Sequence, residues 1–322
     1  MTTTYMARAI ADALNEAMAE DPSVMVIGED VELSTIGATK GLVERFGQNR
    51  VRNSPISEAT VVGACVGAAA CGVRPVMDLM FSSFFYVALD QVANQAARLR
   101  YMSGGQVELP LVLFTGTGPS GSAAAQHSEN PHPLLMSLSG VKVVFPSTPA
   151  DARALLVESV RDPNPVVFLL DLMLAGSKGE ISDPPHRVPL GKGVIRRVGT
   201  DVTVVAIGSA VPQSLEAAEV LANEGVAVEV IDPRTLVPLD DELIESSVRR
   251  TGRLVVADPA RATCGAAAEI ITRVVDRCWM DLRSAPVRVA WEDVPIPYAP
   301  ALESHVTLTA DKIAAAIRAA VA

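Results

Sequence analysis

The chain has 322 residues, of which 49% are hydrophobic and 20% are charged, and its formal net charge is −10. These values describe a globular protein with a large core and exclude a disordered chain. No basic cluster accompanies the acidic charge, which argues against nucleic acid or an anionic membrane as a partner. The length is enough for two domains.

Residues 1–20 predict an amphipathic helix and contain no apolar core of a signal peptide, so we expect a cytoplasmic location. The longest weakly polar run, 61–73, is too short and too rich in glycine to span a bilayer. The cysteines form no CxxC motif and have no metal-type spacing to the histidines, so we expect free thiols and no metal site. They are Cys65, Cys71, Cys264 and Cys278.

Short β-branched runs alternate with longer helical patterns along the whole chain, which indicates parallel sheets with crossover helices. The first series predicts strands at 24–27, 75–80, 110–114, 142–145 and 165–170, and helices at 58–71, 85–102 and 148–161. The second series predicts strands at 201–207, 226–231, 253–257 and 287–291, and helices at 210–224, 240–250, 264–280 and 310–321. We therefore predict an α/β fold of two doubly wound domains, 1–175 and 195–322, joined by a linker at 176–194.

The stretch from Ser54 to Gly67 carries a carboxylate where a helix is expected to begin. Ser54 and Pro55 predict the N-cap and the first helical position, which leaves Glu58 in a first turn where the helix dipole favours an acid. Gly63 and Gly67 lie on one face of this helix, where each costs roughly 1 kcal/mol relative to alanine. Either the helix packs tightly in the core, or a ligand or another backbone comes close and Glu58 is aimed at a cofactor.

The glycine-rich loop from Thr115 to Gly121 follows a predicted strand. It lacks the GxGxxG pattern and the Lys-Ser/Thr of a nucleoside-triphosphate loop, and Pro119 removes an amide donor, so a flexible active-site loop is favoured over a phosphate site. His127 comes soon after it. A lone histidine is usually structural, but this one lies beyond the carboxyl end of a predicted strand, where ligands of open α/β sheets bind.

Other polar groups give weaker signals. Asp78, Asp90 and Glu58 do not have the spacing of a metal-binding carboxylate group, and no GxSxG elbow indicates a catalytic serine. Taken alone, the residues predict a two-domain α/β protein with a candidate site around Glu58 and His127.

Ordered motifs along nearly the whole chain make this interpretation more specific. They are Ile27-Gly-Glu-Asp30, Thr39-Lys-Gly-Leu42, Pro55-Ile-Ser-Glu58, Asp90-Gln91, Arg100-Tyr-Met-Ser-Gly-Gly105, Ala125-Gln-His127-Ser, Pro146-Ser-Thr-Pro-Ala-Asp151, Ile231-Asp-Pro-Arg-Thr235 and Pro297-Tyr-Ala-Pro-Ala-Leu-Glu303. In these motifs the chain resembles the β subunits of the decarboxylating component of 2-oxo acid dehydrogenase complexes, a group in the transketolase superfamily. The resemblance implies an N-terminal pyrimidine-binding domain and a transketolase-type C-terminal domain.

The resemblance also implies a cofactor, thiamine diphosphate, and roles for four residues. Glu58 would hydrogen-bond the aminopyrimidine ring of the cofactor, which requires a buried carboxyl group that keeps or shares a proton. Phe84 would pack on this ring, Ile56 would contact the cofactor, and His127 would contact the substrate. The implied reaction is decarboxylation of a 2-oxo acid and transfer of the acyl group to a lipoyl carrier, for which the cofactor is the electron sink.

One expected element of this family pattern is absent from the sequence. Members of the superfamily hold diphosphate and Mg²⁺ with a Gly-Asp-Gly segment, and none occurs here. By resemblance, a separate α subunit supplies it, so we expect an α2β2 heterotetramer, Mg²⁺ held by the α subunit, and docking of a lipoyl acyltransferase core on the C-terminal domain. The face with Gly63 and Gly67 is then expected at a subunit interface.

The chain departs from the family pattern around the expected substrate entrance, at Ser83, within 170–175 and 131–139, and at Asp258-Pro259. These departures leave Glu58, Phe84 and His127 in place. They keep open a second hypothesis, a stand-alone carboligase or split transketolase-like enzyme with the same half-site. A third is a structural or regulatory partner without catalysis, against which the retained Glu58 and His127 argue.

Overall fold

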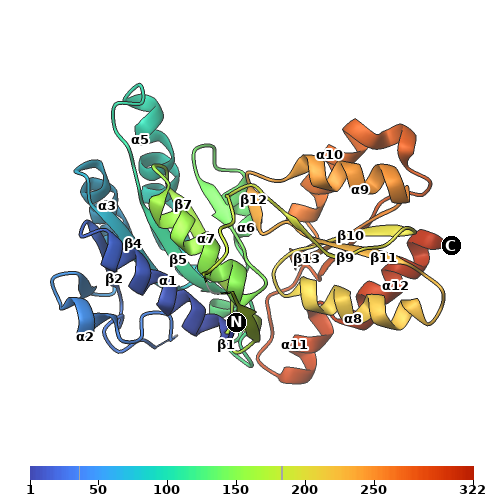
Figure 1. Ribbon diagram of the computed structural model, residues 1–322, viewed down its shortest axis with the longest axis horizontal. Coiled ribbons are helices and arrows are strands. Elements are labelled where there is room, and N and C mark those ends of the chain that lie inside the picture. The colour runs from blue at the N-terminus through green and yellow to red at the C-terminus, as the bar shows by residue number, and fades with distance from the viewer. Residues whose placement is uncertain (36, 183) are drawn as a thin grey trace. The chain divides into compact units, whose positions relative to one another are not determined.

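The computed structural model describes residues 1–35, 37–182 and 184–322 (Figure 1). The chain folds into two compact units. The first contains Met1–Gly118 and Leu134–Leu190, and the second contains Pro119–Pro133 and Gly191–Ala322. Both units are α/β, and the predicted fold class is confirmed. Among the described residues, no helix combines the length and the apolar character needed to cross a bilayer.

The first unit is built on a parallel sheet with strand order β6-β7-β5-β4-β2-β3. These strands are β2 (Val24–Gly28), β3 (Val51–Asn53), β4 (Arg74–Phe81), β5 (Val112–Thr117), β6 (Lys142–Val144) and β7 (Val166–Asp171). The helices in residues 1–190 are α1 (Met6–Glu20), α2 (Leu42–Phe46), α3 (Glu58–Ala70), α4 (Phe85–Asp90), α5 (Ala97–Met102), α6 (His132–Met136) and α7 (Pro149–Arg161). A π-helical segment, Gln91–Ala96, joins α4 to α5, so the predicted helix 85–102 is continuous.

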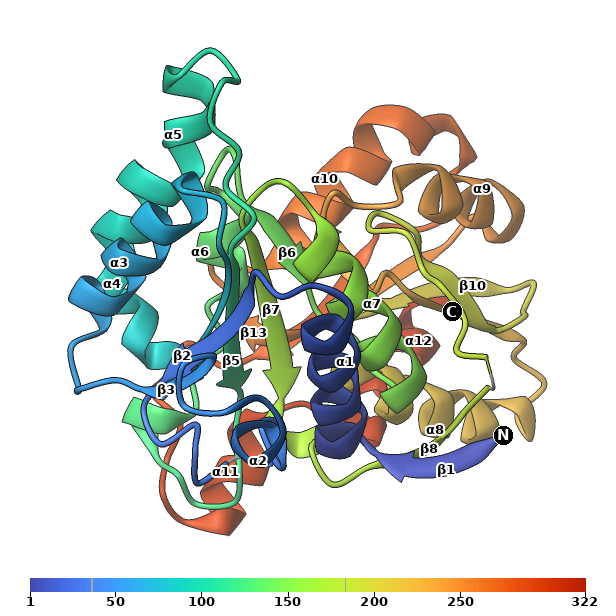
Figure 2. The ribbon, with the colours of Figure 1, turned by 60° about the vertical axis from the view of Figure 1, so that its left-hand side comes forward.

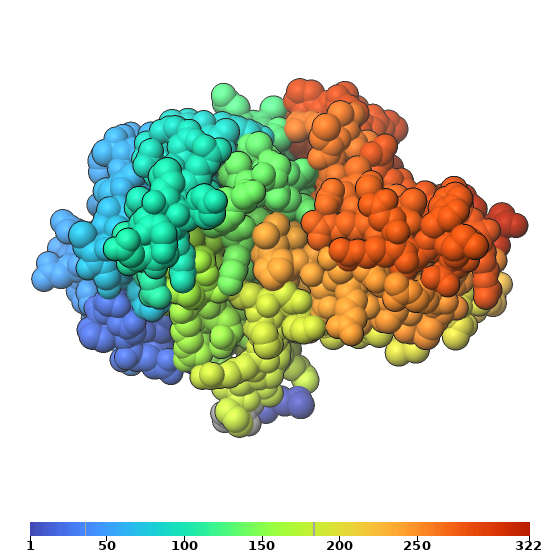
Figure 3. Space-filling view, turned by 90° about the horizontal axis from the view of Figure 1, so that it is seen from above, coloured from blue at the N-terminus to red at the C-terminus, as the bar shows by residue number. Residues whose placement is uncertain are grey.

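Helices cover both faces of this sheet. Helices α1 and α7 pack on one face, and α3 and α4 lie on the other (Figure 2). Alternate residues of the strands point to each face, as a doubly wound fold requires. Those facing α1 and α7 include Val26, Val76, Phe114 and Phe168, which belong to one buried cluster. Helix α5, teal in the space-filling view, forms part of the unit's surface (Figure 3), where Tyr101 is 89% exposed.

The second unit has a sheet with strand order β14-β13-β10-β11-β9, in which only β9 is antiparallel to its neighbour. Its strands, together with the short β12, are β9 (Val194–Arg197), β10 (Val202–Ala206), β11 (Val228–Asp232), β12 (Thr235–Val237), β13 (Leu254–Arg261) and β14 (Val287–Trp291). Its helices are α8 (Ala210–Ala222), α9 (Asp241–Thr251), α10 (Ala266–Cys278), α11 (Pro300–Val306) and α12 (Ala310–Val321). Helices α9 and α10 lie on one face of the sheet, and α8 and α12 lie on the other (Figure 1).

The units differ in two places from the expected bounds 1–175 and 195–322. Residues 119–133, which we call the His127 segment, belong to the second unit. Most of the expected linker 176–194 belongs to the first unit, where β8 (Lys178–Ile181) pairs antiparallel with β1 (Thr2–Tyr5). Residue 183 of this linker lies outside the described residues. Strand β8 has no periodicity of its own, and its extended form depends on the pairing edge that β1 offers.

Candidate active site

The candidate site is built where two neighbouring parallel strands end. Gly28 at the end of β2 lies opposite Asp78 on β4, and Glu29 follows Gly28 directly. A Cβ at Gly28 would lie 2.4 Å from the backbone oxygen of Asp78, so only glycine permits this approach of the two strands. The carboxyl ends of parallel strands are where open α/β sheets bind ligands. Two carboxylates are thereby brought to one edge of the sheet.

Helix α3 brings the third carboxylate. It begins at Glu58, with Ser57 in the N-cap position, so the predicted cap at Ser54 and Pro55 was wrong by three residues. The reason is a contact distant in sequence: the Ser54 N–H donates to the Gly28 carbonyl at 2.8 Å, which keeps Ser54 next to β2. Glu58 is therefore the first helical residue, where the helix dipole favours a negative charge.

Phe84 is placed by an abrupt end to β4. Asp78 Oδ1 accepts the Met80 N–H at 2.8 Å, and Met80 has a left-handed φ of 57°. The pairing of β4 with β5 is irregular between Asp78 and Phe81, and a short 3-10 turn, Ser82–Phe84, follows. The Phe84 ring packs edge-on against Phe81, with 6.0 Å between centroids. This turn presents the ring of Phe84 beside the end of the strand.

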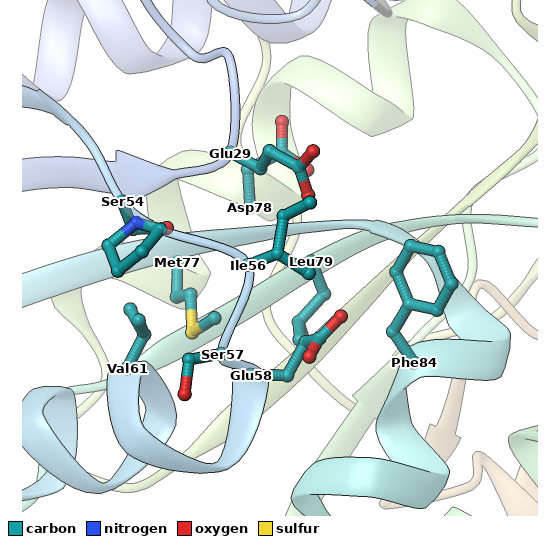
Figure 4. A pocket seen from close by; sticks show the side chains of 11 residues that line it. Glu29, Ser54, Ile56, Ser57, Glu58, Val61, Met77, Asp78, Leu79 and Phe84 are labelled. Atoms are coloured by element: carbon teal, nitrogen blue, oxygen red, sulfur yellow. The ribbon is translucent and has the colours of Figure 1, made fainter.

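These elements border one shallow pocket, which is partly open to solvent and leaves about 10 Å³ of space for water. In Figure 4 the Glu58 and Glu29 carboxylates point toward the space around Ile56, and the Phe84 ring flanks it. Ile56 is 74% exposed, while Glu58 and Phe84 are half-buried. The full lining is Glu29, Ser54, Pro55, Ile56, Ser57, Glu58, Val61, Met77, Asp78, Leu79 and Phe84. An exposed isoleucine and a half-buried acid at an open pocket are typical of a site that needs a further wall.

Asp78 is the most strongly perturbed acid in this pocket. Burial raises the pKa of its carboxyl group from 3.8 to about 7, against a smaller opposing effect of the Met80 N–H. Asp78 therefore exchanges a proton near neutral pH. Perturbed carboxyl groups in a pocket are characteristic of functional sites.

The structure brings three of the four predicted site residues together. Ile56, Glu58 and Phe84 line the pocket, and His127 is not among its lining residues. His127 ends a 3-10 turn, Ala125–His127, in the part of the chain that packs with the second unit. Asp90, considered with Asp78 and Glu58 for metal, does not line the pocket either.

Sequence reasoning missed Glu29 and undervalued Asp78 as pocket residues. A signal was present, because both lie at or near the ends of predicted neighbouring strands, where polar residues gather at ligand sites. Among the described residues, no group of three or more His, Cys, Asp and Glu side chains is arranged to hold a metal ion.

The two glycines of α3 have different surroundings. A Cβ at Gly63 would lie 2.9 Å from Gln91 Oε1, so Gly63 allows α3 to pack on the π-helical segment of the same chain. Gly67 is exposed, and a Cβ there would meet nothing within 4 Å. Close packing within the chain therefore accounts for Gly63 but not for Gly67.

Two family models match the chain. Residues 3–176 match the pyrimidine-binding domain of transketolase, and residues 191–313 match the transketolase C-terminal domain. In a comparison of structures, the chain is similar to a split-gene transketolase described as an inactive β4 tetramer. The TM-score is 0.80 at 27% identity, covering 98% of this chain and 97% of that one.

Curated relatives are similar over nearly their full lengths. The β subunit of acetoin:2,6-dichlorophenolindophenol oxidoreductase from Bacillus subtilis is 41% identical, covering 96% of this chain and 94% of the relative. The pyruvate dehydrogenase E1 component subunit β from Acholeplasma laidlawii is 38% identical, covering 99% and 98%. The 2-oxoisovalerate dehydrogenase subunit β 2 from Arabidopsis thaliana is 38% identical, covering 97% and 88%.

Proposed function

The chain belongs to the family of E1 β subunits of 2-oxo acid dehydrogenases, with transketolase-type pyrimidine-binding and C-terminal domains, and from this premise we propose which residues perform its reaction. We propose that, together with an α subunit, it decarboxylates a 2-oxo acid with thiamine diphosphate and passes the acyl group to a lipoyl carrier. The observation that carries this proposal is the convergence of Glu58, Phe84 and Ile56 on one pocket. Relatives from three such enzymes share the chain's full length.

The pocket residues fit an aromatic ring with a hydrogen-bonding edge. Phe84 offers a flat apolar face, Ile56 an apolar contact, and Glu58 a carboxyl group that can hold or move a proton at its oxygen. When bound, the cofactor supplies the electron sink for the loss of carbon dioxide. Within the chain, Glu58 holds the proton at the ring edge, while Phe84 and Ile56 orient the ring and exclude water from it.

We propose His127, which belongs to the second unit, as a further catalytic residue. An imidazole N–H can donate a hydrogen bond, which suits contact with the carboxylate or carbonyl oxygen of the substrate. A histidine in this role is a positioned acid or base rather than a nucleophile.

An α subunit is implied because the relatives are named as β subunits. We propose that it supplies the diphosphate and Mg²⁺ site, for which this sequence has no Gly-Asp-Gly segment. The open side of the pocket and the exposed Ile56 support a wall contributed by this partner. An α2β2 heterotetramer that docks on a lipoyl acyltransferase core through its C-terminal domain completes the proposal.

The alternative is a carboligase or split transketolase-like enzyme that passes the acyl group to an aldehyde or ketone. The structural similarity to a split-gene transketolase supports it. The dehydrogenase relatives favour the first function, because their identity of 38–41% exceeds the 27% of that structure.

The test is reconstitution with the α-type subunit, thiamine diphosphate, Mg²⁺ and a panel of 2-oxo acids. Decarboxylation coupled to an artificial electron acceptor, and acylation of a lipoyl domain, are the expected results. Acyloin formation without acylation of the lipoyl domain would favour the alternative. A reconstituted complex that binds no thiamine diphosphate would rule out both enzymes.

A further inference from the structure

The His127 segment is fixed to the second unit on both sides of its turn. Ahead of the turn, the Ser122 N–H donates to a carboxylate oxygen of Glu303 at 3.1 Å. After the turn, two guanidinium nitrogens of Arg261 donate to the two oxygens of Glu129, each at 2.7 Å. These charge-assisted contacts are stronger than ordinary hydrogen bonds. The segment is therefore a held element and not a flexible loop.

A buried pair lies at the end of the same segment. His132 Nε2 is 2.7 Å from Asp258 Oδ1, and both side chains are completely buried. The other oxygen of Asp258 accepts the Ala267 N–H at 2.9 Å, at the start of α10. Beside this pair, Asn130 Nδ2 donates to the Pro259 carbonyl. Asp258 thus connects strand β13, helix α10 and the His127 segment.

The backbone just ahead of His127 is strained. Ser122 and Ala124 are not glycines, yet their φ angles are 65° and 59°. Such conformations persist only where the surrounding contacts determine them, and they concentrate at functional sites. The contacts of the segment with Glu303, Arg261 and Asp258 support this conformation.

We infer that His132 and Asp258 are positioning residues that fix His127 for its contact with substrate. This inference rests on the proposed function, because only a His127 that meets the substrate needs a fixed orientation. A buried hydrogen-bonded polar pair contributes little to stability compared with apolar residues of the same shape, so a geometric role accounts for it better than a stabilising one. His132 lies within 131–139, where the sequence departs from the family pattern.

The competing explanation is that the pair only stabilises the second unit. Loss of stability lowers the amount of active enzyme, whether or not His127 is present. Loss of positioning, in contrast, lowers kcat only while His127 is there to be positioned. A double-mutant cycle separates the two.

The experiment measures kcat and KM of the reconstituted complex for wild type, Asp258→Asn, His127→Ala and the double variant. Asp258→Asn keeps the shape of the side chain and removes its charge. We expect it to lower kcat by about tenfold or more in the presence of His127, and by no more than about twofold in the His127→Ala background. Thiamine diphosphate binding should equal wild type in all four proteins, because the pocket at Glu58 belongs to the first unit.

Two further variants keep the test decisive. If Asp258→Asn does not assemble, His132→Gln replaces it, because its amide can still donate to Asp258. The control is Ser247→Ala, which removes a buried hydrogen bond to Glu229 elsewhere in the second unit. It should lower the melting temperature and change kcat equally in both backgrounds.

The outcomes distinguish the inference from the proposed function. Equal falls of kcat in both backgrounds, or an unchanged kcat in Asp258→Asn, would overturn the positioning role alone. An unchanged kcat in His127→Ala would remove the proposed role of His127, and the inference with it. The proposed function itself fails if the wild-type complex binds no cofactor.

Discussion

The pocket at Glu58 and the His127 segment hold their functional residues in place by different means. In the pocket, placement comes from backbone: a glycine contact between β2 and β4, the first turn of α3, and a left-handed residue that ends β4. In the His127 segment, placement comes from side-chain pairs, with Arg261 on Glu129 and His132 on Asp258. The two kinds of support respond to different perturbations, since steric contacts are insensitive to salt and the partly exposed pair of Arg261 with Glu129 is not.

The two regions also differ in whether the backbone or the side chains are fixed. In the pocket the backbone is fixed, but Glu58 is half-buried and Ile56 is exposed. We therefore expect a partner subunit to cover these side chains. The His127 segment is held by contacts within this chain. A partner subunit is therefore expected to affect cofactor binding more than the conformation of the His127 segment.

The largest expected effect in the pocket comes from Glu58→Gln. The amide cannot exchange a proton, so turnover of the reconstituted complex should fall by about 1,000-fold, within the range for general acid–base catalysis. Subunit assembly, measured by gel filtration, should be unchanged. The control is Glu44→Gln, an exposed first-turn glutamate of α2 outside the pocket, which should retain full turnover. Wild-type turnover in Glu58→Gln would remove the role proposed for this residue.

Asp78→Asn tests the pocket's second acid through stability. The folded pKa of about 7 exceeds the ordinary value of 3.8, so the stabilisation present below about pH 4 is lost as pH rises to about 7. The difference of about 3 units corresponds to about 4 kcal/mol at most. Asparagine keeps an acceptor for the Met80 N–H, so the variant should gain stability over wild type at pH 8 and not at pH 4.

Urea unfolding of the full chain at both pH values provides the measurement. Asp276→Asn, which changes an exposed carboxylate on α10, serves as the control and should leave the pH dependence as in wild type. If Asp78→Asn shows the pH dependence of wild type, burial does not perturb Asp78 in the way described.

Arg261→Gln weakens the second region. Its ion pair with Glu129 is partly exposed, so we expect a loss of about 1 kcal/mol in the free energy of unfolding and faster proteolysis within 119–133. High salt should reduce the difference between variant and wild type. The matched control is Arg318→Gln, which removes a two-point ion pair with Glu224 away from this segment. Equal cleavage of both variants within 119–133 would contradict the proposed hold on the segment.

Gly67→Ala has the smallest expected effect. Its Cβ would meet nothing within 4 Å, so the full chain alone should gain up to about 1 kcal/mol from helix propensity. Gly63→Ala is the paired variant, and its gain should be smaller because Gln91 must move. If Gly67 faces the α subunit, Gly67→Ala should weaken assembly while stabilising the free chain. Unchanged assembly would place the subunit interface elsewhere.

The regular elements of the fold could be predicted from the sequence, because they depend on local periodicity. The strand β14 and the helix α12 begin and end at the predicted residues. Short elements such as β1, β8 and β3 were missed, since three- or four-residue strands owe their form to a neighbouring edge. The N-cap of α3 was misplaced for a similar reason, because the Ser54 N–H donates to the Gly28 carbonyl.

The residues of the candidate site could be predicted where they match the family pattern. Pro55 to Glu58 form one of the ordered motifs, and Phe84 matches an aromatic of the family. The structure brings them to one pocket, while their roles stay predictions. The contact between His132 and Asp258 at the end of the His127 segment could not be predicted, because the two residues are 126 positions apart and neither belongs to a recognisable pattern.

The membership of residues 119–133 in the second unit has a consequence for building hybrid enzymes. The chain passes between its two units after Gly118, after Pro133 and after Leu190. A gene fusion that exchanges C-terminal halves between homologues at residue 190 would pair each His127 segment with foreign counterparts of Asp258, Arg261 and Glu303. Functional chimeras therefore require the segment and the C-terminal half to come from the same parent.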